Sequence, residues 1–416
     1  METVVSFELP HISLSDTYDI KNIKIKEFKI KGFEKKKKEL NKARALLDEP
    51  YKNNKKKYQQ ITNLFSKEGP IKEFIHEKYN TPNVSNAWLK EYEILSKYKV
   101  FPNVAETCEY MDNASHPGSW ILGAYHYVNT MCDIKNFKWC ASSLVTESDE
   151  NKNPLDDTYF LNRNYPDNYL MSDTNNGDVT ILNNQIDFFK RKGGTIDVYT
   201  SDLGFSASNN YDKEEEAHLR ANVAQILTAL LVLKPGGSSI TKQFTFMTSL
   251  LISVMGILTT LFDKVDICKP MFSRPGNSET YLVCIGYHGF NPENKSSVQY
   301  LLLDKIKNWS TTPLITKKNL GSKFINMIQN AQNYFADTQI THLENVISEY
   351  NLLKNKNIKY ITSYNRFSKQ NEIDQKRWLK INVIRSLPNN KRLNVREVMY
   401  RENNKSNHYR QRLPMN

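Results

Sequence analysis

Short apolar, strand-like runs alternate with helix-forming segments through the middle of the chain, and no other feature of the sequence limits the possible fold as much. The strand-like runs are residues 106–113, 137–145, 194–202, 238–244, 265–270 and 281–287, and the helical segments are residues 119–131, 212–233 and 244–262. Strands separated by helices predict an α/β fold with a doubly wound sheet. In such sheets, ligand sites form beyond the carboxyl ends of the strands.

Three polar residues stand at the ends of these apolar runs: Asp202, Lys242 and Glu279. A lysine that is crowded by carboxylates and by a second lysine can have its pKa tuned for proton transfer. Such a group helps to activate a poor nucleophile such as a sugar hydroxyl, which must lose its proton to react near neutral pH. The alternative interpretation of Lys242 and Glu279 is a surface salt bridge at the strand ends.

Six segments between Ser85 and Tyr287 resemble, in order and in spacing, the cap ribose 2'-O-methyltransferases of the FtsJ/RrmJ-like, S-adenosylmethionine-dependent superfamily. They are SNAWLKEYEI, DNASHPGSW, NNGDVT, TSDLGFS, VLKPGGSSITKQF and CKPMFSRPGNSETYLVCIGY, and the region that they span covers nearly half of the chain. SDLGFS followed by SRPGNSE looks more like the eukaryotic and viral cap enzymes than the bacterial ribosomal RNA enzymes. The core looks closest to the enzymes of large cytoplasmic DNA viruses.

The resemblance implies a Rossmann-like methyltransferase sheet with helices on both faces and a catalytic tetrad. The matching residues are Lys90, Asp202, Lys242 and Glu279. Lys242 is expected to take the proton of the 2'-hydroxyl or to hold the incipient alkoxide, while Lys90 and Glu279 position it and adjust its basicity. Asp202 is expected to lie near the methyl donor and to support the charged lysine. The methyl group then passes by in-line displacement.

The same resemblance implies that the cofactor, S-adenosylmethionine, binds at the first strand-to-helix turn, where glycines allow a close approach of the backbone. In this chain, His116 stands where the family usually has a glycine, and Ser119 replaces the second glycine of a pair. Asp178 matches the family acid that faces the adenosine. The expected cofactor-binding residues are Ser115, His116, Pro117, Gly118, Ser119, Trp120, Asp178 and Val179.

The basic excess of the chain lies in its two flanks. Residues 1–80 hold 18 Lys+Arg against 12 Asp+Glu, and residues 301–416 hold 21 against 8. We therefore expect basic, mainly helical flanks over these ranges and a methyltransferase domain over residues 81–300. Basic flanks attract a polyanion such as RNA. Beside the site, Lys269 and Arg274 are candidates for RNA phosphate contacts, and Arg274 has the alternative role of pairing with a core carboxylate.

The cysteine and hydropathy patterns indicate an intracellular protein. The five cysteines form no CxxC pair and no Cys/His cluster, so we expect reduced core thiols and no metal site. The N-terminus shows no secretory signal. Residues 244–262 approach the length of a membrane span, but their threonines and serines favour a buried helix. A cytoplasmic location, in the host cytoplasm or the virion for a viral protein, without membrane contact is expected.

The predicted function is methyl transfer from S-adenosylmethionine to the ribose 2'-hydroxyl of the first transcribed nucleotide of capped mRNA. Other capping or transcription subunits are further candidate partners. The loop over residues 156–176 offers aromatic side chains for stacking the cap guanine: Tyr159, Phe160, Tyr165 and Tyr169. Two alternatives remain open. One is a 2'-O-methyltransferase for ribosomal or transfer RNA, and the other is a non-catalytic RNA-binding or scaffold subunit whose cofactor pocket is closed by His116 and Ser119.

Overall fold

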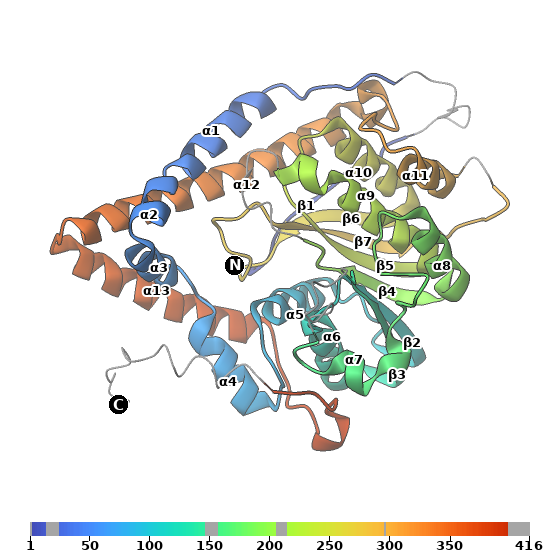
Figure 1. Ribbon diagram of the computed structural model, residues 1–416, viewed down its shortest axis with the longest axis horizontal. Coiled ribbons are helices and arrows are strands. Elements are labelled where there is room, and N and C mark those ends of the chain that lie inside the picture. Colours follow the sequence, from blue (N-terminus) through green and yellow to red (C-terminus); the bar gives the residue numbers. More distant parts are fainter. Residues whose placement is uncertain (1, 14–24, 146–156, 205–213, 295–296, 398–416) are drawn as a thin grey trace.

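A seven-stranded mixed sheet forms the centre of the protein, with the strand order β1-β6-β7-β5-β4-β2-β3 (Figure 1). The structure is a computed structural model and describes residues 2–13, 25–145, 157–204, 214–294 and 297–397. The strands are β1 (Val5–Glu8), β2 (Val104–Asn113), β3 (Asp133–Ser142), β4 (Ile196–Ser201), β5 (Leu233–Gln243), β6 (Phe262–Lys269) and β7 (Thr280–Tyr287). β2 to β5 pair in parallel, whereas β7 is antiparallel to β5 and β6, and β1 is antiparallel to β6.

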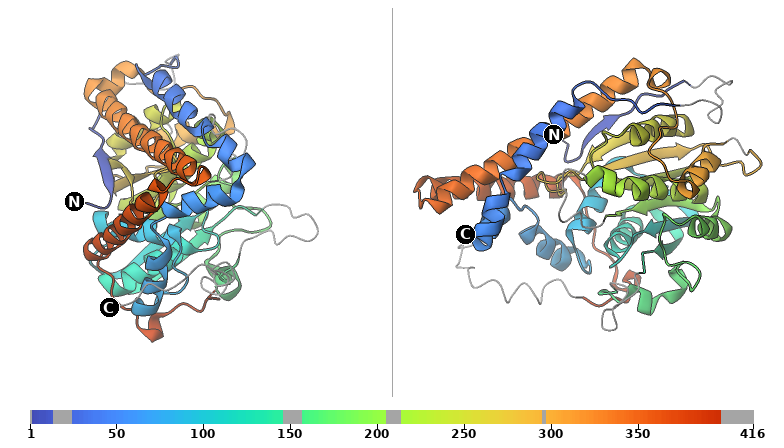
Figure 2. Two further views of the ribbon diagram at one scale, coloured as in Figure 1. Left: turned by 90° about the vertical axis from the view of Figure 1, so that its left-hand side faces the viewer. Right: turned by 45° about the horizontal axis from the view of Figure 1, so that its top comes forward.

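Helices cover both faces of the sheet, and a further group of helices extends past the ends of the strands, to the left in Figure 1 (Figures 1 and 2). The α-helices are α1 (Phe33–Ala45), α2 (Asp48–Asn53), α3 (Lys55–Leu64), α4 (Gly69–Tyr79), α5 (Asn86–Tyr98), α6 (Ser119–Met131), α7 (Leu161–Asn164), α8 (Leu182–Lys192), α9 (Glu214–Val232), α10 (Ser249–Leu261), α11 (Val298–Lys307), α12 (Lys317–Lys354) and α13 (Lys359–Ile381). Short 3-10 helices form at η1 (Pro166–Asn168) and η3 (Asn389–Lys391).

Alternating side chains of the strands pack into two separate hydrophobic cores, one on each face of the sheet. On β7, Leu282 and Cys284 belong to a core that also contains buried residues of α9, α10 and α12. Tyr281 and Val283 belong to the other core, together with residues of α5, α6 and α13. Successive side chains of a strand point to opposite faces, so this division confirms the predicted α/β sheet with helices on both faces.

Two element boundaries in the domain differ from the prediction. β5 begins at Leu233, so the Pro-Gly-Gly sequence that was expected to separate helix from strand lies within the strand itself. α10 occupies only the second part of the predicted helix, because the buried carboxylate of Glu215 accepts hydrogen bonds from the backbone N–H groups of Met247 and Thr248 just before it. The first two residues of the predicted helix over 212–233 lie outside the described residues.

The apolar stretch is a buried helix, as predicted. α10 is buried along nearly its whole length between the sheet and α12. In the parts of the chain that the structure describes, no helix is both long and apolar enough to cross a membrane.

The N-terminal flank contributes a strand that the sequence analysis does not predict. Val5–Glu8 pairs with Asp266–Lys269 and so covers the outer edge of β6, which removes an exposed row of backbone donors and acceptors. The basic helix α1 is not fully solvated either. It lies along α12 (Figure 2) and buries an apolar stripe made of Phe33, Leu40 and Ala43.

The C-terminal helix α13 packs against the methyltransferase core through Trp378. This side chain is 0% exposed, and its ring centroid lies 5.3 Å from that of Phe272 and 6.4 Å from that of Tyr92. Tyr92 belongs to α5, whereas Phe272 belongs to the loop between β6 and β7. Helix α13 is therefore part of one of the two hydrophobic cores, whereas α12 of the same flank is part of the other.

We expect Trp378→Ala to lower the free energy of unfolding by about 3–5 kcal/mol, because it leaves a large cavity in a packed core. Ile361 lies on the same helix but is 60% exposed, so Ile361→Ala should change this free energy by less than about 0.5 kcal/mol. Chemical denaturation of both variants measures the difference. Similar effects of the two substitutions would contradict the packing role of α13.

Candidate active site

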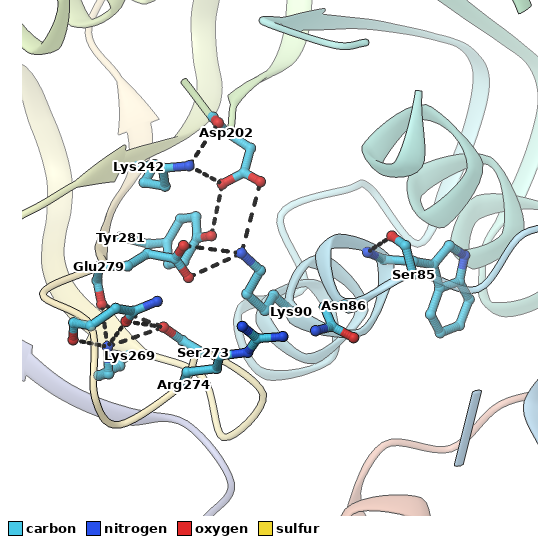
Figure 3. A network of polar contacts seen from close by, with 12 residues as sticks. Ser85, Asn86, Lys90, Asp202, Lys242, Lys269, Ser273, Arg274, Glu279 and Tyr281 are labelled. Atoms are coloured by element: carbon cyan, nitrogen blue, oxygen red, sulfur yellow. Dashed lines mark hydrogen bonds and ion pairs between the residues drawn. The ribbon is translucent and has the colours of Figure 1, made fainter. Parts of the chain in front are cut away.

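The four predicted catalytic residues meet where the parallel strands β4 and β5 end (Figure 3). Asp202 directly follows β4, and Lys242 lies near the carboxyl end of β5. Glu279 directly precedes β7, which runs antiparallel to β5, so its amino end lies at that same place. Lys90 comes from α5, which begins after Ser85, whose hydroxyl accepts the backbone N–H of Trp88 at 3.1 Å.

Two ion-paired lysines flank the carboxylate of Asp202. Lys90 Nζ lies 3.0 Å from Glu279 Oε1 and 3.8 Å from Asp202 Oδ2. Lys242 Nζ lies 3.2 Å from Asp202 Oδ1 and donates to the Asp202 carbonyl at 3.0 Å. The side chains of Lys90 and Glu279 are each 10% exposed, against 12% for Lys242 and 20% for Asp202. The cluster is thus largely shielded from water, and Asp202 is its most exposed member.

The charges of Lys90 and Glu279 are fixed by their surroundings. Burial lowers the pKa of Lys90, but the nearby carboxylates of Asp202 and Glu279 outweigh it, so the pKa is raised overall. Burial raises the pKa of Glu279, but the neighbouring lysines, Lys90 first, hold it well below its usual range. Both groups therefore stay ionised near neutral pH, and Lys90 is not a candidate proton acceptor.

Tyr281 is a further polar member of the site that the sequence analysis does not identify. Its hydroxyl donates to Asp202 Oδ1 at 2.8 Å, and Lys90 Nζ lies 5.8 Å from the centroid of its ring. Tyr281 is two residues after Glu279 at the start of β7, and side chains two apart point to the same face of a strand. That spacing is the signal from which it was predictable.

Lys269 organises the loop between β6 and β7 from within the protein. Its Nζ donates to Ser273 Oγ at 3.0 Å, to Asn277 Oδ1 at 2.9 Å and to the Glu279 carbonyl at 2.6 Å. Burial lowers its pKa to about 8. Its ammonium group is therefore engaged with protein oxygens at the position where an RNA phosphate contact was expected.

Arg274 lies at the tip of the same loop and is 68% exposed. Its Nη2 is 3.2 Å from Oε1 of Glu68, a carboxylate whose side chain is only 7% exposed. The alternative role of Arg274, pairing with a core carboxylate, is thus present in the structure. Its exposure also leaves guanidinium surface within reach of a phosphate group.

A chain of buried hydrogen bonds lies beneath the tetrad and was not predicted. Tyr110 donates to Glu91 Oε1 at 3.2 Å and lies 2.6 Å from the hydroxyl of Thr200, which donates to Asp112 Oδ1 at 2.7 Å. Burial holds the pKa of both carboxyl groups, Glu91 and Asp112, well above the usual range. The chain joins α5, which carries Lys90, to β2 and β4.

The segment predicted to bind the cofactor forms the turn from β2 into α6. The Ser115 N–H donates to the Ser142 carbonyl at 3.1 Å, which places the turn against the end of β3. Gly118 precedes α6 with φ of 107°, and a Cβ there would lie 2.1 Å from Leu161 Cδ1. Only a glycine fits at this position without displacing Leu161.

Side chains of this turn contact neighbouring elements. The His116 ring, next to Pro117, stacks on Tyr169 with ring centroids 5.2 Å apart. Ser119 Oγ accepts a hydrogen bond from Ser85 Oγ at 2.8 Å. The Trp120 ring stacks on Tyr281, with centroids 5.5 Å apart, and so links the cofactor turn to the tetrad.

The second predicted cofactor segment lies beside the same end of β3. Val145 N–H donates to the carbonyl of Asn176 at 2.7 Å. The next residues form a turn before α8, in which Asp178 Oδ1 accepts the N–H and the hydroxyl of Thr180, both at 2.8 Å. Val179 is 3% exposed. The side chain of Asp178 therefore shapes this turn in addition to its expected role toward the adenosine.

The aromatic loop predicted to stack on a cap guanine is largely committed to the protein core. Tyr159 and Tyr169 are 6% and 7% exposed, so neither offers a free ring face. Phe160 lies near two guanidinium groups, with Arg163 4.3 Å and Arg396 5.2 Å from its ring centroid. The expectation of guanine stacking is wrong for Tyr159 and Tyr169, because loop residues were treated as exposed.

A mixed sheet with helices on both faces, and with two lysines and two carboxylates at the ends of its strands, fits the predicted Rossmann-like methyltransferase fold. The FtsJ-like methyltransferase family matches residues 83–287. The probable methyltransferase EP424R of African swine fever virus is 32% identical over 349 residues, which cover 79% of this chain and 77% of that protein. The chain belongs to the FtsJ-like methyltransferase family, which confirms the predicted resemblance.

Two more distant proteins are also similar. The mouse protein named cap-specific mRNA (nucleoside-2'-O-)-methyltransferase 2 is 28% identical over 323 residues, which cover 76% of this chain and 38% of that protein. A structure described as a putative ribosomal RNA methyltransferase from Plasmodium falciparum is 19% identical and covers 50% of this chain and 100% of that chain with a TM-score of 0.31. A likeness of that size does not bear on the substrate.

The family uses S-adenosylmethionine as its methyl donor, so this chain is an S-adenosylmethionine-dependent methyltransferase. Two features of the structure fit this cofactor. The buried hydroxyl of Ser142, at the carboxyl end of β3, makes no hydrogen bond to a described residue and so retains its capacity for a ligand. The first turn of α6 presents backbone N–H groups that have no partner within the helix.

Glu93, on α5, accepts the backbone N–H of Met271 at 3.0 Å and so anchors the loop that leads to Glu279. Burial raises its pKa from 4.5 to about 7. The folded protein therefore favours the protonated carboxyl group. Stability from this group is present in full below pH 4.5 and is lost as the pH rises through about 7.

Glu93→Gln replaces the carboxyl group by an amide that does not titrate. Between pH 4.5 and about pH 7, we expect the free energy of unfolding of the wild type to fall by about 3 kcal/mol relative to that of this variant. Denaturant titrations from pH 4 to pH 8 measure this difference. Glu91 and Asp112 are present in both proteins, so their contribution cancels. Parallel pH curves for the two proteins would contradict the assignment.

Proposed function

We propose that this chain transfers a methyl group to the ribose 2'-hydroxyl of the first transcribed nucleotide of capped mRNA. The observation that carries the proposal is the convergence of Lys90, Asp202, Lys242 and Glu279 from four separate elements into one ion-paired cluster. The similarity to the mouse protein named cap-specific mRNA (nucleoside-2'-O-)-methyltransferase 2 supports the choice of a cap ribose as acceptor. The exposed guanidinium of Arg274 beside the site supports an RNA substrate.

S-adenosylmethionine supplies an electrophilic methyl group when it is bound. The turn from Ser115 to Trp120, the hydroxyl of Ser142 and the turn at Asp178 and Val179 are the groups that would hold it. All of them lie at the carboxyl ends of β2 and β3 or directly beyond, next to the tetrad. Within the sheet, Asp202 is the tetrad residue nearest to these cofactor groups. It directly follows β4, and β4 is paired with β2.

Lys242 is the residue that acts on the ribose hydroxyl. Its Nζ contacts the carboxylate and the carbonyl of Asp202, which fix the position of the amine. In its neutral form the amine withdraws the hydroxyl proton as the oxygen attacks, whereas in its charged form the ammonium group stabilises the developing alkoxide. Alignment of the hydroxyl with the methyl group supplies much of the rate.

Lys90, Glu279 and Tyr281 keep Lys242 and Asp202 in place. Lys90 bridges Glu279 and Asp202, so it holds the carboxylate against which Lys242 is aligned. The Tyr281 hydroxyl donates to the Asp202 oxygen that also faces Lys242. These residues act by position and by fixed charge, without exchanging protons themselves.

We expect Lys242→Ala to reduce methyl transfer by about 10²–10⁴-fold, the usual contribution of a general base. Its affinity for S-adenosylmethionine should stay close to that of the wild type, because the lysine acts on the hydroxyl and not on the cofactor. Lys234→Ala is a matched control, since Lys234 pairs with Asp197 at the opposite ends of the same two strands. Comparable activity in the Lys242 and Lys234 variants would reject the tetrad assignment.

Capped RNA should be a much better substrate than the same RNA with a 5'-triphosphate, and the label should be confined to the first ribose. The reason is that an enzyme that modifies this ribose must hold the cap at a fixed distance from Lys242. Methyl transfer to both RNAs, followed by nuclease mapping of the label, provides the test. Equal rates, or label at an internal ribose, would point to another RNA as the substrate of the same methyltransferase.

A further inference from the structure

The loop from Pro270 to Ser278 carries Glu279 into the active site, yet it has little structure of its own. Two turn bonds lie within it, from Ser273 N–H to the Pro270 carbonyl and from Asn277 N–H to the Arg274 carbonyl. The rest of its support comes from other parts of the chain. Supports from the methyltransferase domain include Lys269 and Glu93.

Two further anchors of the loop come from the flanking helices. Arg44, on α1, donates from Nη2 to the hydroxyl of Ser278, the residue directly before Glu279. Gln339, on α12, donates from Nε2 to the carbonyl of Gly276 at 2.8 Å. Neither helix lies within residues 83–287, the range that matches the family.

We propose that Arg44 and Gln339 are positioning residues of the active site, so that the two flanks together set the place of Glu279. This inference rests on the proposed function, because it assigns the flanks a part in that reaction. The strongest observation is the arrangement at Ser278. Its hydroxyl accepts from Arg44 and donates to Glu214 Oε2 at 2.8 Å, which ties the loop to the start of α9.

The surroundings of Arg44 favour this role over an RNA contact. Its guanidinium lies 3.7 Å from Glu214 Oε2, and the side chains of the two residues are only 16% and 19% exposed. A largely buried and paired guanidinium has little left to offer a phosphate group. The arginine therefore neutralises Glu214 and fixes the hydroxyl between them.

Gly276 lies close against α12, so that Gln339 of this helix reaches the backbone of the loop. A Cβ at Gly276 would lie 3.0 Å from Cδ2 of His342, one helical turn beyond Gln339. Loss of either anchor releases the backbone on one side of the loop. A displacement of about 1 Å at a catalytic group is enough to cost about 10²-fold in rate.

The experiment compares Arg44→Ala and Gln339→Leu with Lys37→Ala, on the full chain. Lys37 is a matched control, because it pairs with Glu216 across the same two helices, α1 and α9, but is not bonded to the loop. We expect kcat to fall about tenfold or more in the first two variants, with KM for RNA and the affinity for S-adenosylmethionine within about twofold of the wild type. Arg44→Lys should restore part of the loss.

Hydrogen exchange gives a second readout that needs no activity. Backbone amides of residues 271–279 should exchange faster in Arg44→Ala than in Lys37→Ala, at a similar Tm. A raised KM for RNA with a weaker salt dependence would overturn the proposal in favour of an RNA contact. Equal behaviour of Arg44→Ala and Lys37→Ala would also overturn it. If the wild type methylates no RNA, the proposed function fails, while the exchange rates still decide whether Arg44 holds the loop.

Discussion

The pairing of buried lysines with buried carboxylates at the ends of the strands is the constraint on which the rest of the structure depends. Two ammonium groups and two carboxylates share a largely buried position, and an unpaired charge there is costly. Compensation requires α5, β4, β5 and β7 to meet at one place. The reversed direction of β7 matters most, because it brings the residue before the strand to the edge where the parallel strands end.

Much of this arrangement was predictable from the sequence. The alternation of strands and helices predicted the sheet, and the resemblance identified the four charged residues that the structure brings together. The remainder depends on contacts between residues far apart in the chain. β1 is a four-residue strand that exists by pairing with β6, and the start of α10 is set by Glu215 on another helix. Glu93 acts through a partner, the backbone N–H of Met271, that local patterns do not reveal.

The flanks illustrate the difference between formal charge and available charge. Their excess of lysine and arginine predicted attraction to RNA, but several of these cations are paired within the protein. Lys36 pairs with Asp337 of α12, and Lys37 pairs with Glu216 of α9. Such pairs fasten α1 to its neighbours and reduce the field that reaches a nucleic acid. The aromatic ring of Trp378, also in a flank, is buried in a hydrophobic core and is therefore not available to stack on a base.

The path of the chain around the loop at Pro270–Ser278 also bears on the order of events during synthesis. A polypeptide emerges from the ribosome with its N-terminal part first. By the time Glu279 has been made, all four charged groups of the tetrad exist, but α12, which carries Gln339, has not yet been translated. A nascent chain of this length holds all four charged groups but lacks Gln339 and Trp378, which both contact the loop before Glu279. The loop before Glu279 therefore gains its full set of contacts only after both α12 and α13 have been translated.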